Sequence, residues 1–269
     1  MKDFAFGQYY PAKSPIHSLD PRVKILLTIA YAVAVFLSGS FIAYLPALAF
    51  LILTVAFSKI PLLKVLKSVK AILFLVLFTS VLNIFFNSSG NALLEWKFIK
   101  ITDGGLIFAG MLSCRLILLV TGTSLLTFTT NPVAITDGIE SLMYPLKLIK
   151  VPVHDIALTM SIALRFIPIL SEEVQKIMLA QKARGADFDT GSIFKRAKAM
   201  LPVLIPLFIS AFRRADELAI AMDARCYGAT EKRTRYKELK IKYGDIISLF
   251  LGAALVAGVV LLNLFVHIV

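Results

Sequence analysis

The stretch that decides the fold is "ILLTIAYAVAVFLSGSFIAYLPALAFLILTVAFS", Ile25 to Ser58, which contains no charged residue. A transmembrane helix needs about 20 predominantly apolar residues, with a lower limit of about 17. The stretch is long enough for two such helices, and Ser38-Gly39-Ser40 provides a break between them. It therefore predicts a hairpin of two membrane-spanning helices.

The composition of the whole chain agrees with this interpretation. Of the 269 residues, 58% are hydrophobic and only 17% are charged, and the mean hydropathy is +0.81. A soluble domain of this length is much less apolar, so we expect an all-α integral membrane protein in the lipid bilayer. The net charge of +12 is typical of basic cytoplasmic loops and does not indicate nucleic-acid binding. Cys114 and Cys226 are too isolated to predict a disulfide, which favours a reducing cytoplasmic setting.

Charge asymmetry predicts the orientation. The connector after the hairpin contains four lysines and no acidic residue, namely Lys59, Lys64, Lys67 and Lys70. Short loops rich in Lys and Arg remain on the cytoplasmic side. Because Arg22 and Lys24 precede the hairpin, both of its ends and the N-terminus are expected in the cytoplasm.

The remaining apolar runs complete a multi-pass topology. Residues 87–103 carry balanced charges and the one tryptophan, Trp96, and are expected to form a loop on the outer face. A final apolar run, Ile246 to Val269, is expected to be a fifth span. The first four spans are expected at about residues 25–37, 41–57, 71–86 and 106–128.

Arg115 lies near the middle of the fourth expected span. An arginine at this depth costs roughly 2.5 to 3.5 kcal/mol on insertion scales. The expected spans contain no acidic partner for it, so we expect backbone carbonyls or a polar cleft beside its guanidinium.

The chain between Asn131 and Gly244 breaks the pattern of long apolar runs. Ile156 to Leu170 and Met200 to Phe212 are its longest apolar stretches, and both contain proline. Runs this short favour interfacial or protein-buried helices over spans. The expected organisation is a transmembrane region, a cytoplasmic block of coupling helices and a last transmembrane helix, at residues 1–130, 131–244 and 245–269.

A repeated motif occurs in this block. "AQKARG" (Ala180 to Gly185) returns 41 residues later as "AMDARC" (Ala221 to Cys226). Each copy ends an amphipathic stretch, so Arg184 and Arg225 are predicted to project from exposed helix ends. A cation at a helix C-terminus is worth about 0.3–1 kcal/mol on its own, but that explanation does not require the small alanines that both copies repeat.

The residues after the two arginines predict unequal helix ends. Gly185 suits the left-handed conformation that terminates many helices. Cys226 adopts that conformation less readily, and Gly228 is expected to cap the second helix instead. A guanidinium can bind a carboxylate with two hydrogen bonds, so two such ends predict docking into the acidic grooves of a dimeric cytoplasmic partner. The expected docking residues are Ala183, Arg184, Gly185, Ala224, Arg225 and Cys226.

Catalytic motifs are missing from the sequence. It has no P-loop pattern, and His17, His154 and His267 lack metal-ligand spacing. We therefore expect no catalytic residue, metal or cofactor on this chain. Two alternatives remain open: a membrane-embedded enzyme with Asp216 and Asp223 as metal ligands, and a structural anchor for a cytoplasmic partner.

Four motifs in this order resemble the transmembrane T component of energy-coupling-factor (ECF) transporters, a family that includes subunits of cobalt and biotin uptake systems. Together they extend from the N-terminus to the end of the cytoplasmic block. The motifs are "SPIHSLDPRVK" (Ser14 to Lys24), "RFIPIL" (Arg165 to Leu170), "AQKARGADF" (Ala180 to Phe188) and "RRADELAIAMDARCYG" (Arg213 to Gly228).

The resemblance implies a non-catalytic subunit of an importer in the plasma membrane of a prokaryote. Two ABC-type ATPase subunits would bind ATP and Mg²⁺, and a separate substrate-binding membrane subunit (S subunit) would select a vitamin or micronutrient. Arg184 and Arg225 would dock into the ATPases, with Cys226 replacing the usual glycine. Further supporting roles are expected for Arg165, Arg115, Pro202 and Asp223.

Overall fold

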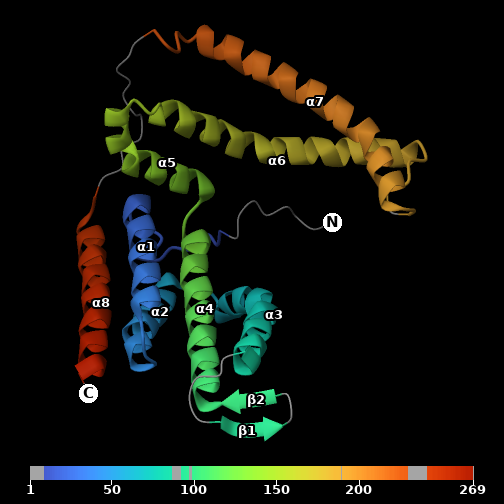
Figure 1. The fold of residues 1–269 in the computed structure, drawn as a ribbon. Helices are drawn as coiled ribbons and strands as arrows, with labels where there is room; N and C mark the ends of the chain where they lie inside the picture. Colours follow the sequence, from blue (N-terminus) through green and yellow to red (C-terminus); the bar gives the residue numbers. More distant parts are fainter. Residues whose placement is uncertain (1–8, 87–91, 97–98, 189, 230–240, 269) are drawn as a thin grey trace. The chain divides into compact units, whose positions relative to one another are not determined.

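The computed structural model describes residues 9–86, 92–96, 99–188, 190–229 and 241–268. Helices dominate them, which confirms the predicted all-α class (Figure 1). In chain order the elements are α1 (Pro21–Leu37), the 3₁₀ helix η1 (Ile42–Tyr44), α2 (Leu45–Ser58), α3 (Leu62–Phe86), β1 (Ala92–Trp96), β2 (Ile99–Thr102), α4 (Asp103–Thr129), α5 (Pro132–Leu142), the 3₁₀ helix η2 (Tyr144–Ile149), α6 (Val153–Ala183), α7 (Ile193–Asp223) and α8 (Tyr243–Ile268).

The described residues form two compact units. The larger, here called the bundle, joins residues 9–153 to residues 241–268 and therefore contains both the first and the last helix. The smaller, here called the paired-helix unit, consists of residues 154–229 and contains almost all of α6 together with α7.

Two helices, α1 and α2, form where the hairpin was predicted, but α1 is not among the described helices that are long and apolar enough to cross a membrane. Asp20 caps α1, because its Oδ1 accepts a hydrogen bond from the backbone N of Arg22 at 2.9 Å, and Pro21 occupies the first turn, where a missing N–H costs nothing. At the other end the buried Ser38 hydroxyl donates to the carbonyls of Ala34, at 3.0 Å, and Ala43, at 3.1 Å. Ser38 thus joins the end of α1 to the returning segment.

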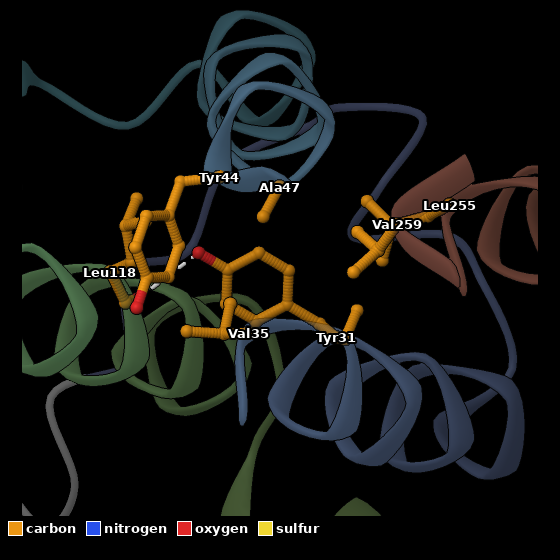
Figure 2. Close-up of a cluster of buried hydrophobic side chains, with 8 residues drawn as sticks. Tyr31, Val35, Tyr44, Ala47, Leu118, Leu255 and Val259 are labelled. Carbon is orange, nitrogen blue, oxygen red and sulfur yellow. Dashed lines mark hydrogen bonds between the residues drawn. The ribbon is translucent and has the colours of Figure 1, made fainter. Parts of the chain in front are cut away.

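The bundle core lies where α1, α2, α4 and α8 meet (Figure 2). Tyr31 is buried at its centre, and its hydroxyl donates to the carbonyl of Leu118 in α4 at 3.1 Å. Gly122, one turn further along α4, allows this approach: a β-carbon there would lie 2.1 Å from the Tyr31 ring. Val35 of α1 and Val259 of α8 are fully buried in the same cluster.

The outer surface of the bundle is strongly apolar. Phe74, Phe86 and Phe250 are each about four-fifths exposed, at 79%, 81% and 78%. Apolar exposure on this scale suits contact with lipid or another membrane protein and is unsuited to water. By length and composition, the helices able to cross a membrane are α3, α4, α6 and the Tyr243–Phe265 part of α8, with η1–α2 as a shorter apolar helix.

Three helices are longer than the sequence predicted. The lysine-rich connector is mostly part of α3, which begins at Leu62 and contains Lys64, because lysine favours helix once Pro61 has set the start. Likewise Pro168 lies inside α6, and α7 continues through Pro202. A proline removes one hydrogen bond but holds φ near the helical value, so it weakens a helix without necessarily ending it.

The segment predicted as an outer loop contains a two-stranded antiparallel hairpin. Strands β1 and β2 pair Glu95 with Lys100 and Trp96 with Ile99. Sequence analysis predicted this segment as a loop and did not predict its strands. The alternating β-branched residues Ile99 and Ile101 favour a strand.

A buried carboxylate joins the two ends of the bundle. Asp245, at the start of α8, is fully buried. Its Oδ1 accepts from the backbone N of Asp20 at 2.8 Å, and its Oδ2 from that of Lys242 at 2.7 Å. The buried Lys24, whose charge is attracted by both aspartates, donates from Nζ to the carbonyls of His17 and Thr129 at 3.2 and 3.1 Å.

His17, with a neutral imidazole, holds the segment before α1 in place. Its Nε2 lies 2.9 Å from the carbonyl of Tyr10, which can only accept, so Nε2 bears the proton. Its Nδ1 then accepts from the Ser14 hydroxyl at 2.6 Å. Burial, together with the nearby charge of Lys24, lowers the pKa of His17 below its usual value. These hydrogen bonds explain why the polar residues Ser14 and His17 precede α1.

Asp245→Ala is expected to destabilise the bundle. The substitution leaves two amides without their acceptor, and the buried Asp20 amide, once unpaired, costs about 1–3 kcal/mol. We expect Asp245→Ala to have a lower midpoint of thermal unfolding in detergent than the wild type. Asp245→Asn should have an intermediate midpoint, because its amide oxygen replaces one acceptor. Asp216→Ala, at an exposed position of α7, is the control. An unchanged midpoint for Asp245→Ala would contradict the assigned role.

Candidate partner-binding site at two helix ends

The two helices of the paired-helix unit each end beside an arginine. Helix α6 ends at Ala183, directly before Arg184. Helix α7 ends at Asp223, and its C-cap residue Ala224 directly precedes Arg225. In Figure 1 the C-terminal ends of α6 and α7 lie on opposite sides of this unit.

The end of α6 has the geometry of a Schellman cap. Gly185 has a positive φ of +87°, as predicted, and its N donates to the carbonyl of Lys182 at 3.0 Å. The N of Ala186 donates to the carbonyl of Gln181, also at 3.0 Å. These bonds satisfy carbonyls that the end of the helix would otherwise leave unpaired.

The end of α7 repeats this geometry residue for residue. Cys226 has a φ of +55°, and its N donates to the carbonyl of Asp223 at 2.9 Å. The N of Tyr227 donates to the carbonyl of Met222 at 3.0 Å. Every donor and acceptor lies 41 positions after its counterpart in α6, so the sequence repeat is also a repeat of backbone structure.

The expectation that Gly228 would replace Cys226 as the capping residue was wrong. Cys226 itself adopts the left-handed conformation, because the two cap hydrogen bonds fix the position of that residue relative to the helix end. Gly228, two positions later, has a φ of +99° and forms a separate turn. The left-handed conformation costs a residue with a β-carbon about 1–2 kcal/mol, so the α7 cap is the more strained one.

Both ends are open to a partner. Within the described parts of the chain, neither the Arg184 nor the Arg225 guanidinium has a hydrogen bond or ion pair. Each therefore presents its planar donor group beside small side chains, an arrangement suited to a carboxylate. The exposed residues at these ends are Ala183, Arg184, Gly185, Ala224, Arg225 and Cys226.

The predicted supporting residues are spread over both units. Arg165 is exposed on α6 and Pro202 on α7, each well before the helix end, whereas Asp223 contributes its carbonyl to the α7 cap. Asp216 and Asp223 were the alternative metal ligands. Over the described residues, no group of three or more His, Cys, Asp and Glu side chains gathers where it could hold a metal ion.

Arg115 belongs to the bundle and not to the helix ends. Its Nη2 donates to the carbonyl of Ser38 at 2.8 Å and its Nε to the Tyr44 hydroxyl at 3.1 Å. The expected backbone carbonyl partner is thus confirmed. Because Ser38 is the C-cap of α1, Arg115 ties α4 to the turn of the first hairpin.

Sequence analysis did not identify Glu173 as a contact residue. The structure brings Glu173 of α6 against α7, where Ser210 Oγ donates to its Oε1 at 2.5 Å. Arg214 Nη2 donates to its Oε2 at 3.0 Å. One signal was available: Arg214 follows Glu173 by 41 positions, the offset of the motif repeat.

The two caps are expected to respond in opposite directions to substitution. Gly185→Ala places a β-carbon on a left-handed residue with no clash nearby, so it should weaken the α6 cap by about 1 kcal/mol, whereas Cys226→Gly should strengthen the α7 cap by a similar amount. Hydrogen exchange should become about fivefold faster in residues 181–186 and about fivefold slower in residues 222–227. Equal exchange in variant and wild type would show that the caps are not strained as described.

Comparison with known proteins agrees with this architecture. The family model for CbiQ, described as cobalt transport protein, matches residues 12–236. The chain is 50% identical to the energy-coupling factor transporter transmembrane protein EcfT of Acidaminococcus fermentans, over 99% of this chain and 96% of the relative. The EcfT proteins of Clostridium kluyveri and Bacillus subtilis are 49% and 44% identical, over 95% of this chain in both cases and 95% and 97% of the relative.

The matches to the relatives span nearly the full length of both aligned proteins. They include the two helix ends and the motif before α1. Over such a length, identities near one half show common descent and a common fold. The chain belongs to the CbiQ/EcfT family of transmembrane components of energy-coupling factor transporters.

Proposed function

We propose that this chain is the subunit that couples ATP hydrolysis to substrate uptake in an ECF-type importer. In this proposal two cytoplasmic ABC-type ATPase subunits bind ATP and Mg²⁺ and dock on the ends of α6 and α7. A separate membrane subunit binds a vitamin or other micronutrient. The chain itself has no catalytic role, binds no cofactor and transmits movement between its partners.

The observation that supports docking most directly is the equivalence of the two helix ends. Both present an arginine that has no partner among the described residues, on the same backbone cap and among exposed small residues. Two equivalent ends suit a partner with two equivalent grooves, as in a dimer. The Gly185/Cys226 difference suits two ATPase subunits that are related but not identical.

The surface of α7 supports contact with a second partner. Ile205, Phe208 and Phe212 are more than half exposed, at 59%, 62% and 66%, and their spacing places them along one face of the helix. Among the helices described, α7 is not one of those apolar enough to cross a membrane. An apolar stripe on such a helix fits the surface of another membrane protein, which we propose to be the substrate-binding subunit.

The proposed orientation follows from charge. Lys59, Lys64, Lys67 and Lys70 mark the end of the first hairpin as cytoplasmic, and the N-terminus then lies in the cytoplasm as well. The protein would be a multi-pass component of a prokaryotic plasma membrane.

The double variant Arg184→Ala, Arg225→Ala tests the docking role. Removing one partner from a buried charge pair costs about 3–5 kcal/mol, so loss of each contact should weaken ATPase binding roughly 100- to 4,000-fold. The measurement is co-purification of ATPases with the tagged chain in mild detergent, followed by ATP-dependent uptake in liposomes. Riboflavin, folate, biotin, thiamine and Co²⁺ are offered to the wild-type complex, and the compound taken up serves as the probe.

Arg196→Ala is the matched control, because Arg196 is an exposed arginine of α7 near the opposite end of the helix from Arg225. It should bind ATPases and transport like the wild type. Full binding by the double variant would overturn the docking role of the arginines. Binding of ATPases without any ATP-dependent uptake would instead support the alternative of a structural anchor.

A further inference from the structure

Two hydrogen bonds between α6 and α7 converge on one carboxylate. Each oxygen of Glu173 accepts from a different side chain of α7: Oε1 from Ser210 at 2.5 Å and Oε2 from Arg214 at 3.0 Å. Ser210 and Arg214 are four residues apart and therefore lie on the same face of α7. We call these three residues the crossing network.

The crossing network lies at matching positions of the two repeats. Arg184 follows Glu173 by 11 residues, and Arg225 follows Arg214 by 11 residues. At a rise of 1.5 Å per residue, each arginine is about 16 Å along its helix from the crossing. The crossing thus has two arms of equal length, and their C-terminal ends lie on opposite sides of the unit (Figure 1).

Side chains hold this crossing. Backbone contact between α6 and α7 is sparse over the described residues, so the two helices are not closely packed along their length. The ion pair is partly open to solvent, with side-chain exposures of 41% for Arg214 and 23% for Glu173. A pair this exposed adds little to stability. Its geometric role, two donors of one helix gripping one acceptor of the other, is therefore the more important consequence.

We propose that Glu173, Ser210 and Arg214 are positioning residues that fix the point about which the two coupling helices turn. This inference rests on the proposed function, in which the two helix ends move with the ATPases. About a fixed crossing, equal arms convert a movement of the two ends into a rotation of one helix against the other. Sliding at the crossing would lengthen one arm and shorten the other, so part of the movement would be lost.

Charge reversal tests this role in the complete complex reconstituted in liposomes. Glu173→Arg or Arg214→Glu alone places like charges opposite each other, and uptake of the probe per ATP hydrolysed should fall at least tenfold. ATPase co-purification should be unchanged, because both helix ends remain intact. The combined variant Glu173→Arg, Arg214→Glu restores opposite charges and should recover at least half of the wild-type ratio.

Glu172→Arg is the matched control, since Glu172 is an exposed neighbour of Glu173 on α6 and receives the same change of charge. It should transport like the wild type. Wild-type coupling in both single reversals, or a combined variant no better than the single ones, would overturn the proposal.

A chemical tether distinguishes a fixed crossing from one that must slide. Glu173→Cys and Arg214→Cys are introduced together after Cys114 and Cys226 have been replaced by Ser. Without a cross-linker, this double-cysteine protein lacks the network and should be poorly coupled. A short bifunctional thiol reagent should then raise uptake per ATP at least threefold, whereas each single-cysteine protein should not respond. Unchanged or lower uptake after cross-linking would show that the helices have to move past each other here.

Failure of this inference can be told from failure of the proposed function. If the wild-type complex shows no ATP-dependent uptake and no ATPase binding, the proposed function is wrong. The proposed function stands if the wild type transports and the double variant Arg184→Ala, Arg225→Ala abolishes docking. If neither the charge exchange nor the tether then restores coupling, only the role assigned to the crossing network is wrong.

Discussion

The buried carboxylate of Asp245 is the contact that the rest of the bundle depends on. It accepts hydrogen bonds from the backbone amides of both Asp20 and Lys242. These bonds fix the start of α1 against the start of α8. A buried carboxylate needs hydrogen-bond donors to replace water. Here the donors are backbone amides at the starts of α1 and α8. The Tyr31 cluster then fills the space between α1, α2, α4 and α8 with mostly apolar side chains, and its two tyrosine hydroxyls bond to the Leu118 carbonyl and to Arg115.

The second constraint is repetition. A helix end with a left-handed residue can bond its last carbonyls in only a few ways, and both α6 and α7 use the same one. Glycine meets the requirement at position 185 without strain. Cysteine meets it at position 226 with strain, which the chain tolerates because the two cap hydrogen bonds hold the residue. The same offset recurs at Glu173 and Arg214, so the repeat includes the contact between the helices as well as their ends.

Several differences between prediction and structure have a common physical cause. Proline and lysine were treated as signs of interruption, yet α3, α6 and α7 continue through them. A proline inside a helix costs about 3 kcal/mol, and lysine is a good helix former, so neither residue by itself has to end a helix. The hairpin of β1 and β2 was missed because its strands are short and pair only with each other, which gives a weak periodic signal.

The sequence by itself determined the class of protein, the position of the first hairpin, the repeated arginine motif and the conformation of Gly185, because hydropathy, charge and backbone preference are local properties. Family membership was also readable from motifs in order. Only the tertiary structure decided which polar groups meet: Asp245 with Asp20, Arg115 with Ser38, and Glu173 with Ser210 and Arg214. Such pairs join residues that are distant in the chain or on different helices, and a charged side chain has the same local signature whether it faces water or a partner. The reason is geometric, since the partner of a polar group is set by how helices pack.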